Sequence, residues 1–370
     1  MKIDDKTSHN SPSLRFPEFT GEWEKCKIED ITDAVPSGKS KNHFSNGEYN
    51  LYGSTGIIGR TDKALYDGKL VLVARVGANA GFLQIINEPC GITDNTLILK
   101  PKGIDAFYLY YFLQHLNLNR LIFGSGQPLI TGGMLKKVKV SLGTISEQSK
   151  IVKFLSLLDE RIAVQNRLIE DLKKLRCAIV EKMFKQSKAN GRLGDFIEQV
   201  SVRNKNGLYS NVLSVSNKQG FVKQSEQFED RTVASEDTSN YKIVKRNNFA
   251  YNPARINVGS IARLTKFDVG IVSPMYVCFR TKASIIPEYM EAFFTSQQFF
   301  YEMMKRLEGS VRLCLSYEGL CNIPVYIPDM NKQIAMGQNI SLILSKIGLE
   351  IEYLGRLHQQ KQYLLRKMFI

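Results

Sequence analysis

The sequence predicts an α+β chain in which two mixed α/β globules alternate with two long helices, with a pseudo-twofold relation between the halves. At 370 residues the chain exceeds what one hydrophobic core usually serves, so two domains or a duplicated unit are expected. The segment 148–184 matches 333–369 without gaps at an offset of 185, and both segments end in Lys-Met-Phe. Short β-branched runs separated by Gly and Asn turns precede each segment, which is typical of a mixed α/β globule.

Each repeated segment has the apolar spacing of a coiled-coil helix. Its seam residues recur at alternating steps of four and three, which is the heptad pattern. In the first segment they are Ile151, Leu155, Leu158, Ile162, Gln165, Ile169, Leu172, Arg176, Ile179 and Met183. The second segment keeps the same steps from Met336 to Met368. We therefore expect two long helices, over 146–185 and 331–370.

Polar residues interrupt both seams at matching places, and their charges predict how the helices pair. In an antiparallel pair Gln165 faces Lys361, and Arg176 faces Glu350. A parallel pair instead stacks Arg176 on Lys361, which places two cations in one layer. We therefore expect an intramolecular antiparallel coiled coil. Two alternatives stay open: each helix could pack only on its own globule, or two chains could dimerise through the helices.

The charge balance favours a polyanionic partner. The 50 Lys and Arg residues exceed the 36 Asp and Glu residues by 14, and the sequence pI is near 9.4. Nucleic acid is the first candidate for a surface of this kind. A basic protein without a polyanionic partner is the alternative that charge alone leaves open.

Cysteine usage and the N-terminal residues indicate a cytoplasmic chain. The six cysteines form no Cys-x-x-Cys pair and lie beside no His cluster, so neither a zinc site nor a disulfide framework is expected. Residues 1–13 are polar and lack the apolar run of a signal peptide or a membrane span.

The sequence lacks the motifs of the usual DNA and nucleotide enzymes. An adenine methyltransferase motif needs a second proline and an aromatic residue, which the string 252–255 (Asn-Pro-Ala-Arg) does not have. The glycine turn 77–81 fits neither a P-loop nor a dinucleotide fingerprint. Asp329 with Lys332 is only a fragment of a nuclease motif. We expect a chain without catalysis, and keep a self-sufficient DNA enzyme as a rival.

The segment 13–23, with the sequence SLRFPEFTGEW, resembles the leader of type I restriction–modification specificity subunits, and the resemblance continues across nearly the whole chain. The string Ser146-Glu147-Gln148 opens the first helix as in that family, whereas the second opening keeps only Gln333. Phe16, Phe19 and Trp23 are expected to pack the leader on the first domain. The resemblance implies five parts: a strap (1–22), target-recognition domain 1 (23–145), conserved helical region 1 (146–185), target-recognition domain 2 (186–330) and conserved helical region 2 (331–370).

The resemblance also implies the function and the partners. Each domain would recognise one part of a bipartite DNA target, and the coiled coil would set the gap. About 37 helical residues would separate the domains by up to roughly 55 Å, which spans about 16 base pairs. Two modification subunits would methylate with S-adenosylmethionine, and restriction subunits that use ATP and Mg²⁺ would join them, in a host-defence complex. This chain would bind none of these cofactors. The rival is a coiled-coil protein-interaction scaffold without DNA specificity.

Candidate DNA contacts are polar or basic side chains on turns, since such groups reach base edges and phosphates. In the first domain they are Lys39, Lys41, Ser54, Thr55, Arg60, Arg75, Asn79, Ser125 and Gln127. In the second domain they are Arg203, Lys205, Asn217, Lys218, Arg255, Asn257, Arg263, Ser310 and Arg312. Arg75 and Arg255 are the preferred pair, because both lie in matching Ala-Arg strings before glycine-containing turns that can approach DNA closely. Each arginine could alternatively be a solvated charge or part of a structural ion pair.

Overall fold

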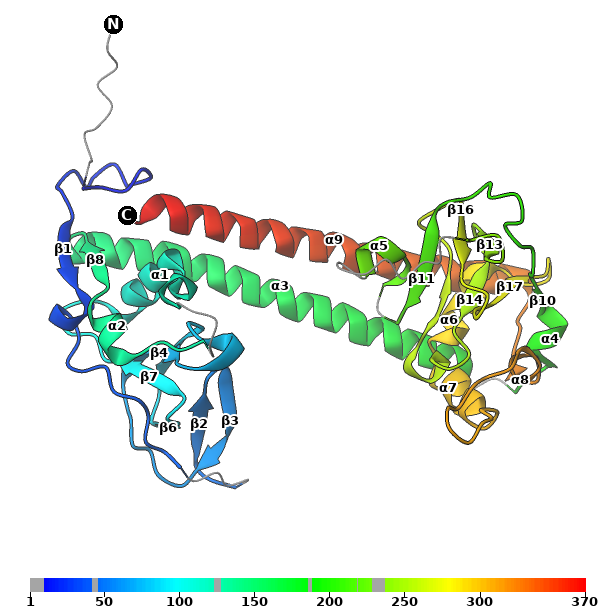
Figure 1. Cartoon of the computed structure of the whole chain (residues 1–370), viewed down its shortest axis with the longest axis horizontal. Coiled ribbons are helices and arrows are strands. Elements are labelled where there is room, and N and C mark those ends of the chain that lie inside the picture. Colours follow the sequence, from blue (N-terminus) through cyan, green and yellow to red (C-terminus); the bar gives the residue numbers. More distant parts are fainter. Residues whose placement is uncertain (1–9, 42–45, 123–127, 186–187, 218, 228–236) are drawn as a thin grey trace, which may run out of the picture. The chain divides into compact units, whose positions relative to one another are not determined.

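The computed structural model describes residues 10–41, 46–122, 128–185, 188–217, 219–227 and 237–370. The chain divides into two compact units. Unit 1 comprises Met1–Asn166 with Glu352–Ile370, and unit 2 comprises Arg167–Ile351. Both units contain helices and sheets, so the α+β class is confirmed (Figure 1).

The described residues of unit 1 form three small sheets and one largely buried helix. An antiparallel pair is formed by β1 (Glu24–Lys27) and β8 (Lys139–Leu142). The second sheet has the order β3 (Gly56–Thr61), β2 (Tyr49–Gly53), β6 (Cys90–Ile92), and the third has the order β5 (Leu83–Asn87), β4 (Lys69–Ala74), β7 (Thr96–Leu99). The helical elements are η1 (Ile28–Asp30), η2 (Gly77–Asn79), α1 (Ala106–Leu116), η3 (Leu118–Leu121) and α2 (Gly132–Lys136). Leu70 to Ala74 of β4 are all buried, which makes β4 the centre of the third sheet.

Where unit 2 is described, its strands form two four-stranded sheets and a short strand pair. One sheet has the order β10 (Ile197–Gln199), β17 (Val277–Thr281), β14 (Phe249–Tyr251), β15 (Ile261–Arg263). The other has the order β12 (Gly220–Lys223), β11 (Val212–Ser216), β16 (Val269–Val272), β13 (Lys242–Lys245). The strand pair is β9 (Gly191–Arg192) with β18 (Pro324–Val325). The helical elements are α4 (Leu193–Phe196), α5 (Gln224–Gln227), η4 (Ile256–Val258), α6 (Pro287–Phe294), α7 (Gln297–Met304) and α8 (Tyr317–Cys321).

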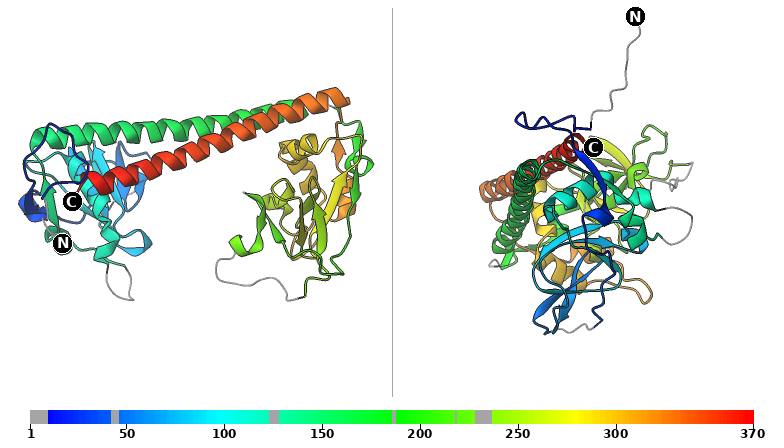
Figure 2. Two further views of the ribbon diagram at one scale, coloured as in Figure 1. Left: turned by 90° about the horizontal axis from the view of Figure 1, so that it is seen from above. Right: turned by 90° about the vertical axis from the view of Figure 1, so that its left-hand side faces the viewer.

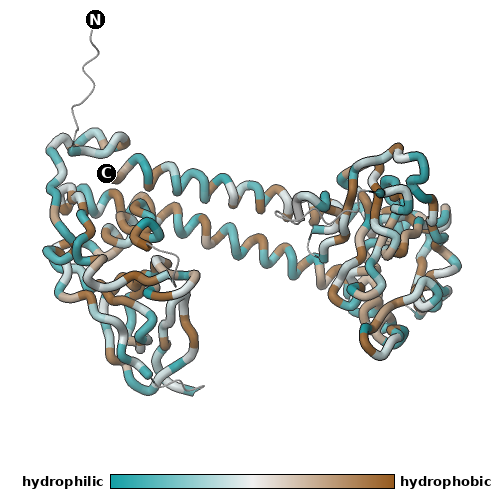
Figure 3. Tube along the Cα trace, viewed as in Figure 1, coloured by the Kyte–Doolittle hydropathy of each residue, from teal (hydrophilic) through white to brown (hydrophobic). Residues whose placement is uncertain are grey.

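Two long helices, α3 (Ile145–Lys185) and α9 (Met330–Met368), confirm the two helical segments. Apolar and polar residues alternate in short groups along both (Figure 3). Each helix contributes one part to each unit. In unit 1, Asp159 pairs with Lys361 at 2.6 Å and Arg161 lies over the Tyr353 ring. From the first of these contacts to the second, the residue number rises on α3 and falls on α9. The two segments therefore run antiparallel within this unit (Figure 2).

The helix ends belong to the cores of the units. In unit 1, Leu155 and Leu158 of α3 and Leu364 of α9 are buried in the core around α1. In unit 2, Val180 of α3 and Ile340 of α9 are buried in the core around α6. Apolar seam positions are thus covered in both units, which explains the heptad spacing.

The duplication in the sequence recurs in the contacts of the two units. Gln148 Nε2 donates to the Gly143 carbonyl at 2.9 Å, and Gln333 Nε2 donates to the Pro328 carbonyl at the same distance. Each glutamine thus binds the carbonyl five residues before it. The terminal aromatics also match: Phe369 packs on Tyr108 and Phe112 of α1, whereas Phe184 packs on Tyr289 and Phe293 of α6.

The strap holds the start of α3 through a buried carboxylate. Glu147 is fully buried and accepts two hydrogen bonds from Arg15, at 2.7 and 2.8 Å, and one from Trp23 Nε1 at 3.1 Å. This hydrogen bonding raises the pKa of Arg15. Trp23 is buried and Phe16 packs against the same core, as expected, whereas Phe19 is only half-buried.

Candidate nucleic-acid interface

In unit 1 the structure brings Arg75 and Ser54 together around Asn95. The Asn95 carbonyl accepts the Arg75 backbone N–H at 2.8 Å and the Ser54 hydroxyl at 3.4 Å. Gln84 donates to the carbonyls of Gly53 and Ser54, which fixes the β2–β3 turn in this cluster. Asn95 is exposed and was not among the predicted residues. Its place in a polar Asp-Asn turn between strands was the signal that could have identified it.

The guanidinium of Arg75 is not neutralised by the described part of unit 1. The side chain is half-buried, and its Nε atom is buried without a hydrogen-bond partner among the described residues. Backbone bonds from Ile130 to the Arg75 carbonyl and from Gly77 to the Pro128 carbonyl fix the turn. Gly77 has a φ of 78°, which favours glycine there. A guanidinium on a fixed turn can donate to an external acceptor.

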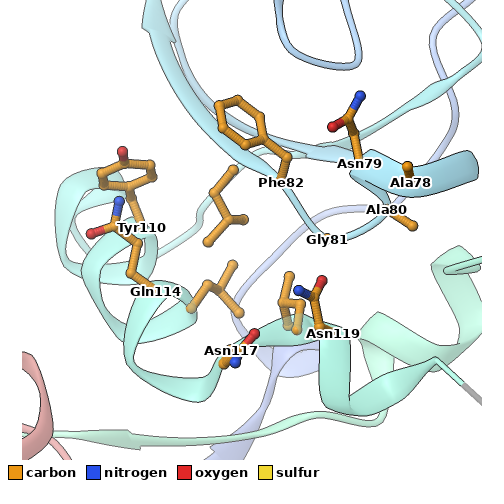
Figure 4. A pocket seen from close by; sticks show the side chains of 12 residues that line it. Ala78, Asn79, Ala80, Gly81, Phe82, Tyr110, Gln114, Asn117 and Asn119 are labelled. Carbon is orange, nitrogen blue, oxygen red and sulfur yellow. The ribbon is translucent and has the colours of Figure 1, made fainter. Parts of the chain in front are cut away.

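Beside this turn lies an uncharged, amide-lined hollow of about 390 Å³. Asn79 and Phe82 border it from the turn after β4, whereas Tyr110 and Gln114 on α1 and Asn119 on η3 border it from the other side (Figure 4). Burial raises the pKa of Tyr110 to about 12. Gln114 Oε1 has no hydrogen-bond partner in the described ranges. The described residues that line this hollow can form hydrogen bonds, but none carries a positive charge that would attract a phosphate.

The other predicted residues of unit 1 are not gathered into this cluster by any described contact. Lys39, Lys41 and Thr55 are exposed. Arg60 is also exposed, and its Nε and NH2 atoms donate to the carbonyls of Gly47 and Glu48 at 2.5 and 2.6 Å, so its role as a DNA contact stays a prediction. These bonds give Arg60 a structural role beside the β2–β3 hairpin. Ser125 and Gln127 lie outside the described residues.

In unit 2 the structure brings Arg255 and Arg312 to one hollow of about 640 Å³. The turn that carries Arg312 is attached to the turn of Arg255 by a bond from Leu315 N to the Pro253 carbonyl at 3.1 Å. Gly309, with a φ of 120°, begins the Arg312 turn. The hollow is also lined by Val212, Leu213, Ser214, Gln224, Tyr241, Asn252, Ala254, Ser273, Met275 and Tyr276. Both arginines are exposed.

Arg263 needs correction as a DNA contact. Its side chain is only 10 % exposed and forms ion pairs with Glu288 and Glu291, and it also donates to Asn247 at 2.9 Å. Burial raises the pKa of Glu291, and the charge of Arg263 opposes that rise. Because its donors are used within unit 2, Arg263 is a structural residue. The ion-pair alternative holds for this position.

The remaining predicted residues of unit 2 differ in how free their side chains are. Arg203 donates to Asn240 Oδ1 at 2.9 Å, which leaves part of its guanidinium available. Lys205, Asn217 and Ser310 are exposed, whereas Asn257 is half-buried. Lys218 lies outside the described residues. These side chains stay predictions as DNA contacts.

The polar seam residues have partners that the heptad pattern did not indicate. Lys361 pairs with Asp159 and lies 5.4 Å from the Tyr111 ring centroid. Glu350 pairs with Lys346 on its own helix at 2.5 Å. Gln165 is buried, and Arg176 lies close enough to Glu291 to favour its charged form. The pairings Gln165 with Lys361 and Arg176 with Glu350 stay predictions.

The described ranges contain neither a metal-binding cluster nor a membrane-spanning helix. No group of three or more metal-binding side chains occurs there. Across the same residues, every helix is too short or too polar to cross a bilayer.

The N-terminal part of the chain is similar to a known family. Residues 20–174 match the family model "Type I restriction modification DNA specificity domain". The type I restriction enzyme MjaVIII specificity subunit of Methanocaldococcus jannaschii is 31 % identical over 119 residues, which are 31 % of this chain and 28 % of that protein. A putative type I specificity subunit of Mycoplasma genitalium is 29 % identical over 184 residues, 45 % of this chain and 46 % of that protein. The aligned parts span less than half of these relatives.

Solved structures extend the likeness of the fold to the whole chain. The S subunit of a type I restriction–modification system from M. genitalium has a TM-score of 0.63 at 20 % identity. It covers 97 % of this chain and 99 % of that chain. A second structure comes from work on the structural basis of complex assembly and conformational transition of the type I R-M system. It has a TM-score of 0.56 at 11 % identity and covers 95 % of this chain and 98 % of that chain. Residues 20–174 are therefore similar to the type I restriction modification DNA specificity domain, and the likeness of the fold extends to the rest of the chain.

Proposed function

We propose that this chain binds duplex DNA sequence-specifically as the specificity subunit of a type I restriction–modification complex. It recognises a bipartite target and directs methylation or restriction, and it is itself non-catalytic. One observation supports this most: Arg75 in unit 1 and Arg255 in unit 2 occupy matching glycine turns, and neither has an acidic partner among the described residues. Free arginines on turns suit both base edges and phosphates.

The duplicated architecture explains why the target would have two parts. Each unit reads one short sequence, and α3 with α9 forms the intramolecular antiparallel coiled coil that sets the gap. The net charge of +14 supplies the sequence-independent attraction to phosphates. The antiparallel packing seen within unit 1 supports this arrangement.

The partners carry the chemistry in this proposal. Two modification subunits dock on the helices and methylate with their own S-adenosylmethionine. Restriction subunits add ATP- and Mg²⁺-dependent cleavage. The complex works in the cytoplasm, where it meets DNA, and this chain supplies recognition and spacing.

Methylome sequencing of host cells with and without the gene tests this proposal. We expect one two-part adenine methylation motif to disappear with the gene and to return with a plasmid copy. A methylome that is identical with and without the chain contradicts the proposal.

A second measurement separates DNA reading from the scaffold alternative. Binding of the purified chain to duplex DNA should weaken as salt rises, with log affinity falling linearly against log salt concentration. Failure to bind any duplex at low salt, together with an unchanged methylome, supports the scaffold.

A further inference from the structure

We infer that the hollow of unit 2 reads a guanine with Arg255 and Arg312 and an adenine with Gln224, so that the half-site of unit 2 contains both bases. The inference rests on the proposed function and deepens it, because it assigns base preferences to named side chains. The three residues line the same hollow of about 640 Å³.

The charges of this hollow are unbalanced. Among the described residues that line it, two are arginines and none is acidic. Several other arginines of unit 2 form ion pairs: Arg246 pairs with Asp268, Arg263 with two glutamates, and Arg280 with Glu198. Arg203 instead donates to the Asn240 amide. The two guanidinium groups at this hollow thus lack the acidic partners that these paired arginines have among the described residues. A guanidinium pairs in bidentate fashion with the O6 and N7 acceptors of guanine.

Gln224 supplies an acceptor that the described part of unit 2 does not use. Its Oε1 atom is buried and has no hydrogen-bond partner among the described residues. Such orphan acceptors are rare in native proteins, because their burial is unfavourable unless a partner arrives. Adenine offers the matching pair of groups: its N6 amino group donates to Oε1, and its N7 accepts from the amide nitrogen.

The rest of the wall favours a base edge over a phosphate. Met275 is 59 % exposed, and it lines the hollow together with Tyr241 and Leu213. Phosphate sites need cations and N–H donors, and they gain nothing from apolar neighbours. Base edges present methyl and ring carbon atoms beside their polar groups, so a mixed wall suits them.

The two arginine turns are fixed before any ligand binds. Glu308 and Cys314 exchange backbone hydrogen bonds at 2.8 and 2.9 Å and close the turn that carries Arg312. The bond from Leu315 to Pro253 attaches this turn to that of Arg255. Fixed donors lose less freedom on binding and so discriminate better between bases.

Chromosomal substitutions followed by methylome sequencing test the inference in the native complex. Arg312→Gln and Arg255→Gln should each lower discrimination at a guanine by roughly 10- to 100-fold, and Gln224→Glu should do so at an adenine. The guanine and the adenine should both lie in the half of the motif that changes when residues 186–330 are exchanged. The other half should remain unchanged and reports that the complex is intact. Arg280→Gln removes an exposed, paired arginine of the same unit and is the control that should leave the motif intact.

The outcomes distinguish this inference from the proposed function. A gene-dependent motif whose unit 2 half lacks guanine or adenine overturns the inference alone. So does a uniform loss of methylation at all sites without a change in base preference, which indicates phosphate contacts. Where methylation becomes too weak to define a motif, competition binding of the purified full-length variant to duplexes with each of the four bases gives the same readout. Absence of any gene-dependent motif contradicts the proposed function itself.

Discussion

Replacement of Glu147 by leucine should destabilise unit 1 by about 3 kcal/mol. The substitution keeps a similar side-chain volume and removes the acceptor of three hydrogen bonds from Arg15 and Trp23. Trp23 is 2 % exposed, so its orphaned indole N–H costs about 1–3 kcal/mol. Arg15 is 14 % exposed, so water can partly solvate its guanidinium in the variant. The free-energy cost of losing its charge partner should therefore be at or below the lower end of the range of about 3–5 kcal/mol for broken buried pairs.

Urea unfolding of the full chain, with hydrogen exchange read on residues 10–23, measures this effect. Exchange should accelerate in the strap and at the start of α3, because Glu147 joins the two. Lys332→Leu is the matched control at the equivalent position of the second repeat, where an exposed ion pair with Asp329 replaces the buried carboxylate. We expect that control to behave as wild type. An unfolding free energy for Glu147→Leu within 0.5 kcal/mol of wild type refutes the assigned role.

Three further perturbations test other parts of the account. Gly309→Ala places a Cβ atom 2.4 Å from the Arg312 carbonyl oxygen, at a residue whose φ is 120°. The substitution should lower the free energy of unfolding by about 1–3 kcal/mol and weaken duplex binding by the full chain. Binding equal to that of wild type contradicts the role of the fixed turn. Phe369→Ala removes a buried ring and should lower the unfolding free energy of unit 1 by about 3–5 kcal/mol, as should Phe184→Ala in unit 2, both measured by urea titration against wild type. Burial lowers the pKa of His115, so unit 1 should lose stability as pH falls through the ordinary histidine range near 6.5. His115→Gln should therefore reduce the change of the thermal unfolding midpoint between pH 7 and pH 5. An unchanged pH dependence in this variant argues against His115 as its cause.

The helices and the duplication could be predicted from sequence because their signals are local and long. A seam from Ile151 to Met183 at steps of four and three specifies a helix without knowledge of its partner. The packing of Trp23 and Phe16 on the first core could be predicted for a related reason, since both are large apolar residues in a short polar segment.

The partners of individual charges could not be predicted, because they depend on folding at a distance. Arg263 meets Glu288 and Glu291 only when α6 packs beside β15. Lys361 finds Asp159, which lies next to the seam of the other helix and outside the heptad positions. Arg255 and Arg312 are 57 positions apart, and only the bonded turns bring them to one hollow.

Exchange of residues 186–330 for the corresponding segment of another specificity subunit tests the central claim of two separate readers most directly. The host methylome should then show a motif with one half changed, and with the other half and the gap preserved. A change in both halves, or in neither, contradicts the assignment of one half-site to each unit.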